Sequence, residues 1–479
     1  MRSKFLPFTL LLTLAACDTP TLLKPTAYDV PQWKEAPVEV AASATEIDHM
    51  WWKRFNDPML DALIDKARSN SPDLKIALAR INQARSEEEG TLADQLPNFS
   101  TKTDASRQRF SRTLSNFPFA PKYANNYTAN FDASWEVNVL GIEPALKASG
   151  QFTARREEDY NQALVTLYGD VARSYFTIRQ LQAQIATTEK NVKTQEDVVT
   201  LASSLNAAGK DSQVNLAQAK ALLATTSASL EPLTRSLKEQ YYTLDALTGA
   251  TPGENSSAMI SPQKQEIPNL NMVLASPSTV IAERPDIRAA ERELSYRAAL
   301  KDVAFAQYYP KLSLSGLLGF ETGKSGSIFK STSKVWTLGG GLSLPIFDFG
   351  RIRADINQAD AIGQEALAAY EKTVLGALSE VESTLAAIAT EQRNYQKLTD
   401  AVEASQLAVT LAEERYRIGR DAYLNVLTAQ QNLYTASNAQ AQSRGEILIQ
   451  QVRLYKSLGS GWKNNTTNVG DENVDKTKK

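Results

Sequence analysis

The sequence has very little of the chemistry on which catalysis and metal binding most often depend. Its 479 residues include one cysteine, Cys17, and one histidine, His49. A single cysteine excludes an internal disulfide, and a single histidine leaves no histidine-based triad or zinc cluster. The glycine-flanked nucleophilic serine of many hydrolases is also absent. We therefore expect a protein that is not an enzyme and that needs no cofactor or metal.

The chain also lacks a strong charge of either sign and, after its first residues, a long apolar run. The formal net charge is −2, and it becomes about −4 if Arg2 and Lys4 are removed with a signal peptide. This balance gives no electrostatic support for nucleic-acid binding. A helix needs about 20 apolar residues to cross a bilayer, and no stretch after residue 16 has that character. If the protein crosses a membrane, we expect it to do so with β-strands.

The lone cysteine lies at the end of a short export signal. Two basic residues precede the apolar run Phe5–Ala16, which has the size of a secretory signal. Leu14-Ala15-Ala16-Cys17 resembles the lipobox of bacterial lipoproteins. This resemblance implies that residues 1–16 are a lipoprotein signal peptide, that Cys17 carries lipid, and that residues 17–58 form a lipid-anchored segment. The alternative is an ordinary signal peptide with a chance cysteine.

Most of the remaining sequence consists of two similar copies of one unit. Two short motifs return 213 residues later, Ser71-Pro72-Asp73 as Arg284-Pro285-Asp286 and Leu96-Pro97 as Tyr309-Pro310. A period of this length indicates a duplicated unit and not a solenoid. We predict repeat 1 at 59–281 and repeat 2 at 282–461, followed by a polar, disordered tail at 462–479. Each repeat begins with a helix, at about 59–95 and 284–308, and continues with two strands and a long helical hairpin.

The hairpins, predicted at about 148–249 and 353–458, show a sustained seven-residue period. Apolar residues recur at Leu164, Val171 and Ile178 in the first copy and at Val374, Val381 and Ile388 in the second. Such a period predicts left-handed supercoiling against other helices, and about 55 residues make a rod of roughly 80 Å. The pattern leaves open an ordinary coiled coil or a ring of helices around a wet interior. Pro232 occurs only in the first copy, where we expect a kink.

The predicted strands alternate between apolar and polar residues. They lie at about 98–113, 126–139, 311–321 and 335–344. Strands with one apolar and one polar face suit a membrane β-barrel with a wet lumen. Four strands are too few to close a barrel, and open edges cannot lie in lipid. Several chains must therefore share one barrel.

Together these features resemble the TolC-like outer-membrane efflux factors, in particular the lipoprotein branch that serves RND pumps (NodT/OprM-like). The motifs that carry the resemblance are Trp51–Leu60, Leu344–Arg351 and Arg415–Gly419. The resemblance implies a mainly α protein with membrane β-strands. It also implies a homotrimer, with a twelve-stranded β-barrel continued by a long periplasmic α-helical barrel.

In this family the hairpin tips meet a periplasmic adaptor and also narrow the pore. The resemblance places the adaptor-contacting tips here at Gly209, Lys210, Gly419 and Arg420. It places residues of the periplasmic gate at Tyr416, Leu424, Asn425 and Asn215, and to these we add the neighbouring charged residues Arg420 and Asp421. Asn425 and Asn215 stand where family members carry acidic residues. Our hypothesis is that an Arg420–Asp421 contact and neutral amides close the gate.

The resemblance implies a passive exit duct for small molecules such as drugs or toxic compounds, opened by contact with the adaptor. The expected partners are the periplasmic adaptor, an inner-membrane RND pump, two further copies of the chain, and outer-membrane lipid through acylated Cys17. The expected location is the outer membrane, although Asp18 would favour inner-membrane retention in enteric bacteria. Two alternatives are a lipid-anchored periplasmic coiled-coil adaptor or scaffold and the exit duct of a type I protein secretion system.

Overall fold

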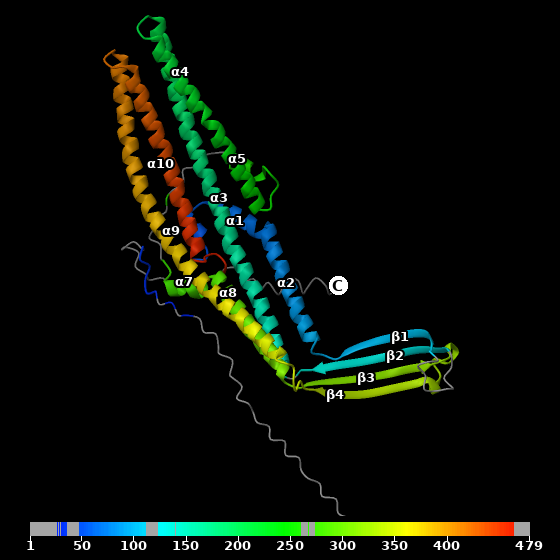
Figure 1. Ribbon diagram of the computed structural model, residues 1–479. Helices are drawn as coiled ribbons and strands as arrows, with labels where there is room; N and C mark the ends of the chain where they lie inside the picture. Colours follow the sequence, from blue (N-terminus) through cyan, green and yellow to red (C-terminus); the bar gives the residue numbers. More distant parts are fainter. Residues whose placement is uncertain are drawn as a thin grey trace, which may run out of the picture.

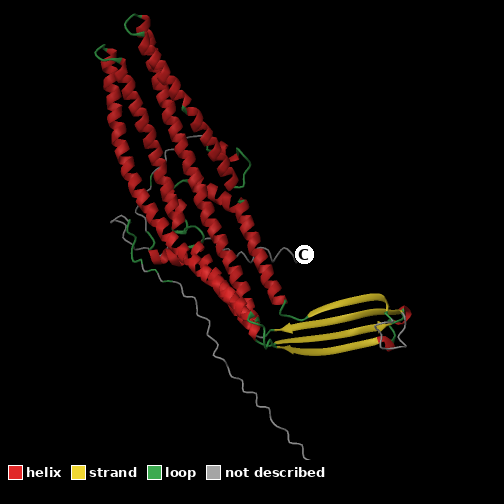
Figure 2. Cartoon of the chain, in the orientation of Figure 1, coloured by secondary structure: helices red, strands yellow, loops and turns green. Residues whose placement is uncertain are grey.

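The computed structural model describes residues 26, 28, 30–35, 47–111, 123–138, 140–259, 267 and 274–463. The molecule has a long helical part, and a sheet projects from one end of it (Figures 1 and 2). The predicted signal peptide, Cys17 and residues 464–479 of the predicted tail lie outside the described residues. Trp462 at the start of that tail is described, and it packs against a hydrophobic core.

The duplication is visible in the order of the elements. The first copy consists of α1 (Pro58–Asn70), α2 (Pro72–Ala93), β1 (Asn98–Arg109), β2 (Tyr123–Val137), α3 (Ile142–Ala207), α4 (Gln213–Ala228) and α5 (Leu230–Leu247). The second consists of α7 (Pro277–Glu283), α8 (Pro285–Phe305), β3 (Lys311–Thr322), β4 (Lys334–Ser343), α9 (Arg351–Arg417) and α10 (Tyr423–Ser457). The short α6 (Glu254–Ala258) follows the first copy, and a 3-10 helix, Trp51–Phe55, precedes it.

Prolines set the helix boundaries. The single helix predicted over 59–95 is wrong, because the chain breaks at Ser71 into α1 and α2. The equivalent break at Arg284 separates α7 from α8. Both residues precede proline and have ψ of 126°, because a following proline disfavours helical backbone. The predicted kink in the first hairpin is a break at Ser229, three residues before Pro232, whereas α10 is continuous.

The four strands form one antiparallel sheet in the order β1-β2-β3-β4. Directly paired residues lie on the same face, and the register aligns Phe131 with Leu318 and Leu318 with Trp336. This apolar face is open, with Leu318 at 65% and Trp336 at 76% exposure. β1 and β4 each have one edge without a neighbouring strand among the described residues.

The helices bury two apolar cores halfway along the helical part. The first combines the aromatic motif Trp51–Phe55 with α1, α3 and α10, and it contains the heptad residues Leu164, Val171 and Ile178. The second contains their counterparts Val374, Val381 and Ile388. Trp51 stacks on Tyr455 with ring centroids 5.1 Å apart. The Trp51–Leu60 motif therefore locks the N-terminal segment onto the helices of both copies.

No described helix combines the length and the apolar character needed to cross a lipid bilayer.

Candidate functional site

The two helical hairpins reverse direction at matching glycines. Gly209 has φ of +67° and Gly419 has φ of +69°, a region that glycine enters without the penalty of a Cβ atom. The backbone N–H of Lys210 donates to Leu205 O at 2.9 Å, and that of Arg420 donates to Arg415 O at 2.9 Å. Both turns lie at the end of the helical part farthest from the sheet (Figure 1).

The same seven-residue pattern builds both tips. Gly-Lys-Asp-Ser-Gln-Val-Asn ends at Asn215, and Gly-Arg-Asp-Ala-Tyr-Leu-Asn ends at Asn425. The amide Nδ2 of Asn215 donates to Asp211 Oδ1 at 2.6 Å, and that of Asn425 donates to Asp421 Oδ1 at 2.5 Å. Each predicted neutral amide is therefore held by an aspartate on its own tip.

A short hydrogen bond joins the two hairpins near their tips. The Tyr416 hydroxyl donates to Asp211 Oδ2 at 2.5 Å, across 205 residues of sequence. Beneath it a small core buries Tyr416 and Tyr423, whose ring centroids are 5.4 Å apart, together with Val198, Ala219 and Val426. The two tips are thus held together by the Tyr416–Asp211 hydrogen bond and by the small apolar core beside it.

The predicted Arg420–Asp421 contact is not formed within this chain. Asp421 accepts instead from Arg415 Nε at 3.2 Å, in addition to Asn425. Arg415 lies in the last turn of α9, and Asp421 lies just before α10. The tight reversal therefore brings these two side chains together, whereas Arg420 remains exposed at the apex.

Asp211 is missing from the gate residues predicted from the sequence. A signal for it exists, because Asp211 occupies the position in the first copy that Asp421 occupies 210 residues later. Asn215 and Asn425 occupy the positions at which the resemblance places acidic residues. The carboxylates Asp211 and Asp421 lie four residues before these amides, just ahead of α4 and α10.

The carboxylates of the tips remain ionised in mildly acidic solution. Burial raises the pKa of Asp211, but hydrogen bonds from Tyr416, Asn215 and Ser212 together outweigh it and bring the pKa below its ordinary 3.8. Hydrogen bonds from Asn425 and the Ala422 backbone lower the pKa of Asp421. Burial, and then the bond to Asp211, raise the pKa of the Tyr416 hydroxyl well above 10. Donor and acceptor are therefore both in their bonding forms around neutral pH.

The apex of each tip is open to a partner. A Cβ atom built on Gly209 or Gly419 meets nothing within 4 Å, and Lys210 and Arg420 are exposed. Val214 and Leu424, at matching positions, are 62% and 55% exposed. Among the described residues no group of three or more His, Cys, Asp or Glu side chains could hold a metal ion. The tips thus present a basic and an apolar side chain at matching positions of the two copies.

Comparisons with known proteins agree with this architecture. The family model for outer membrane efflux proteins matches residues 63–250 and 276–460, which correspond to the two copies. The chain is 34% identical over 94% of its length to the pyoverdine export outer membrane protein OpmQ of Pseudomonas putida, 96% of which is covered. It is 30% identical to the outer membrane protein OprJ of Pseudomonas aeruginosa, with 94% of each chain covered.

Solved structures show the same fold. The outer-membrane channel OprN matches with a TM-score of 0.82 and 29% identity, covering 92% of this chain and 99% of that one. The Campylobacter jejuni CmeC outer membrane channel matches with a TM-score of 0.84 and 26% identity, covering 93% and 95%. The predicted mainly α fold with a small antiparallel sheet and the resemblance are confirmed, and the adaptor alternative is not favoured. The chain belongs to the outer membrane efflux protein family and is an outer-membrane channel component of an efflux system, not an enzyme.

Proposed function

We propose that three copies of this chain form one channel, a shared twelve-stranded β-barrel continued by a barrel of helices. The observation that supports this is the open sheet. β1 and β4 expose backbone donors and acceptors along one edge each, and such edges are costly in lipid. Pairing β1 of one copy with β4 of the next would satisfy both edges and leave the polar faces of the strands around a wet lumen.

The hairpin tips then form the periplasmic gate. The Tyr416–Asp211 bond fastens neighbouring hairpins of one chain, so it favours the closed arrangement. Val214, Leu424, Gly209 and Gly419 give each tip an accessible surface for a periplasmic adaptor. Adaptor contact at these surfaces would separate the hairpins and open a passive path for small molecules supplied by an inner-membrane RND pump.

The N-terminal segment suits a lipid anchor at Cys17. Thr26 donates through its backbone and its hydroxyl to Glu371 of α9, while the backbone N–H groups of Lys34 and Glu35 donate to Glu382. Followed toward the N-terminus, the segment therefore passes along α9 from Glu382 to Glu371, in the direction of the end of α9 that lies beside the sheet (Figure 1). The helix from its start to Glu371 is about 30 Å long. The residues from Thr26 back to Cys17 can span a similar distance, so a lipid on Cys17 can reach the membrane.

The native mass of the detergent-extracted protein tests the proposed function. We expect a trimer in outer-membrane fractions, because a single four-stranded sheet cannot close. Expression in an efflux-deficient strain should restore resistance when the matching adaptor and pump are present. A monomer, or a trimer that restores no efflux with its own adaptor and pump, would contradict the proposal.

Replacing Cys17 tests the proposed lipid anchor independently of channel assembly. We expect Cys17→Ser to abolish incorporation of labelled palmitate, because the chain has no other cysteine, while trimer formation persists through the strands. Labelling of the whole protein in cells, followed by its native mass, measures both effects. Palmitate incorporation that survives the substitution would refute the lipid anchor.

A further inference from the structure

The apolar face of the sheet carries charge at only one of its ends. We define this membrane face as the alternate residues paired in register with Phe131, Leu318 and Trp336. Its described residues include no carboxylate. Its cations are Arg107 and Arg109 on β1 and Lys334 on β4. All three are exposed, and all lie in the half of the sheet remote from the helices.

The opposite, polar face is different. It carries both signs of charge, with Lys102 and Asp104 on β1, Asp132 and Glu136 on β2, and Glu321 on β3. Lys102 pairs with Asn130, and Asn126 donates to Glu321 Oε1 at 3.0 Å. The exclusion of acidic groups is therefore a property of the membrane face and not of the whole sheet.

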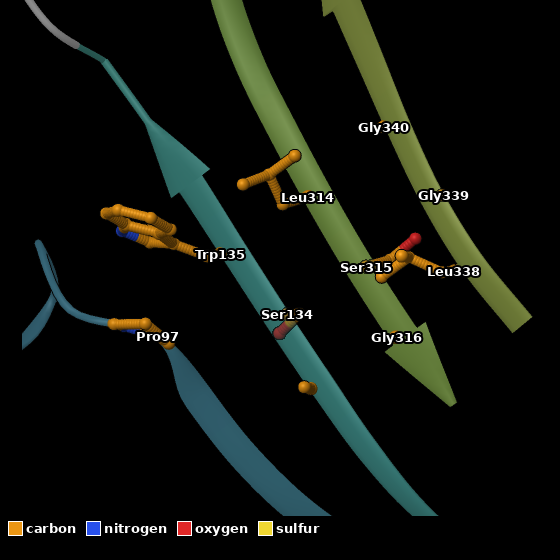
Figure 3. A pocket seen from close by; sticks show the side chains of 10 residues that line it. Pro97, Ser134, Trp135, Leu314, Ser315, Gly316, Leu338, Gly339 and Gly340 are labelled. Carbon is orange, nitrogen blue, oxygen red and sulfur yellow. The ribbon is translucent and has the colours of Figure 1, made fainter. Parts of the chain in front are cut away.

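The two ends of the membrane face also differ from each other. At the helical end there is an apolar hollow of about 620 Å³. Figure 3 shows Trp135, Leu314 and Leu338 on the same side of the sheet around this hollow. Gly316 and Gly340 line this hollow, and their lack of side chains leaves its space unfilled. The helical end of the membrane face can therefore contact an acyl chain. It has no cation on this face that could bind a phosphate group.

At the other end the cations stand among aromatic rings. The guanidinium of Arg107 lies 5.3 Å from the centre of the Tyr123 ring. The loop that joins β3 to β4 adds the exposed residues Lys324 and Lys330, and it contains no acidic residue between Thr322 and Lys334. Exposed aromatics beside basic groups are typical of the level at which a membrane protein meets lipid headgroups.

We propose that Arg107, Arg109 and Lys334, with Lys324 and Lys330, form a binding site for the phosphate groups of the phosphorylated glycolipid in the outer leaflet of the outer membrane. Arginine forks and lysine ammonium groups suit phosphate oxygens, and the absence of carboxylates on this face removes repulsion. This inference rests on the proposed trimeric barrel. There β1 and β4 of adjacent copies would pair, so the site would combine Arg107 and Arg109 of one copy with Lys334 of the next.

The test compares two variants of the full-length trimer by native mass spectrometry with added lipid A. The variant R107Q/R109Q/K334Q removes the cations of the membrane face. The matched control Lys102→Gln removes a cation from the same strand but from the opposite face. We expect the triple variant to bind lipid A at least tenfold more weakly than the wild type and the control to bind as the wild type does.

Further arms of the experiment separate the possible failures. Lipid A that lacks one phosphate should bind more weakly than the intact form, and phosphatidylglycerol should not replace lipid A at equal concentration. A trimer whose triple variant binds lipid A like the wild type would overturn the inference and leave the channel standing. Equal binding of phosphatidylglycerol would overturn the glycolipid assignment. A monomeric protein would overturn both the channel and this site.

Discussion

We expect Tyr416→Phe to make the channel leaky. The substitution keeps the ring in its small core and removes only the hydroxyl that donates to Asp211. A hydrogen bond to a charged acceptor contributes about 1.5–3 kcal/mol, which corresponds to roughly a tenfold to hundredfold shift between closed and open states. Single-channel conductance in planar bilayers measures the effect, and the variant should spend far more time in high-conductance states than the wild type.

Tyr423→Phe is the matched control for this experiment. The Tyr423 ring packs against Tyr416, and its hydroxyl is not the group bonded to Asp211. It should therefore leave conductance unchanged, whereas Asp211→Asn should resemble Tyr416→Phe. Equal conductance of Tyr416→Phe and wild-type channels would remove the tip-to-tip bond from the gate.

The gating role proposed for this bond predicts how conductance depends on pH. The Asp211 pKa lies below its ordinary 3.8 in the bonded state, so the contribution of the bond to the closed state is expected to be fully present above pH 3.8. That contribution is lost only as the pH falls through the lowered value. The Tyr416 pKa lies above its ordinary 10, so the hydroxyl still donates in mildly alkaline solution. Conductance should thus vary little between about pH 5 and 9.

The second large effect concerns stability, and we expect Arg179→Met to destabilise the helical part by about 3–5 kcal/mol. Arg179 is 4% exposed. Its Nε donates to the Tyr175 hydroxyl at 3.2 Å, its Nη1 donates to Gln182 Oε1 at 2.9 Å, and its guanidinium lies 5.1 Å from the centre of the Tyr175 ring. Tyr175 in turn donates to Asp57, the N-cap of α1. Removal of the arginine takes a buried cation from the network in which Tyr175 donates to the Asp57 carboxylate, which is 8% exposed.

The thermal unfolding midpoint of the purified trimer measures this loss. Arg173→Met provides the control, because Arg173 lies on the same helix, is 62% exposed and forms a surface ion pair with Asp170 at 3.8 Å. A surface pair of this kind contributes at most about 1 kcal/mol. The double variant D57N/R179M should recover part of the loss. An Arg179→Met midpoint as high as that of the control would show that the buried network does not stabilise the protein.

The sequence allowed much of the fold to be predicted because its signals are local and repeated. The predicted strands 126–139, 311–321 and 335–344 differ by at most a few residues from β2, β3 and β4. The glycines near 209 and 419 mark the reversals because only a positive φ closes so short a turn. The break within the helix predicted over 59–95 depends on Pro72. Proline is favoured at the first position of a helix, and here Pro72 begins the second helix, α2.

By itself, then, the sequence determined the duplication, the alternating strands, the hairpins and their tips, since each follows from a period or a turn residue that acts over a few neighbours. Only the tertiary structure decided which tip groups meet. Tyr416 reaches Asp211 across 205 residues, and no local pattern encodes which hairpin lies beside which. Asp421 pairs with Arg415 because the closing helices bring the two side chains together. Arg107, Arg109 and Lys334 likewise lie on one face because of the register of the four strands. That register is set by pairing between strands that are far apart in the sequence.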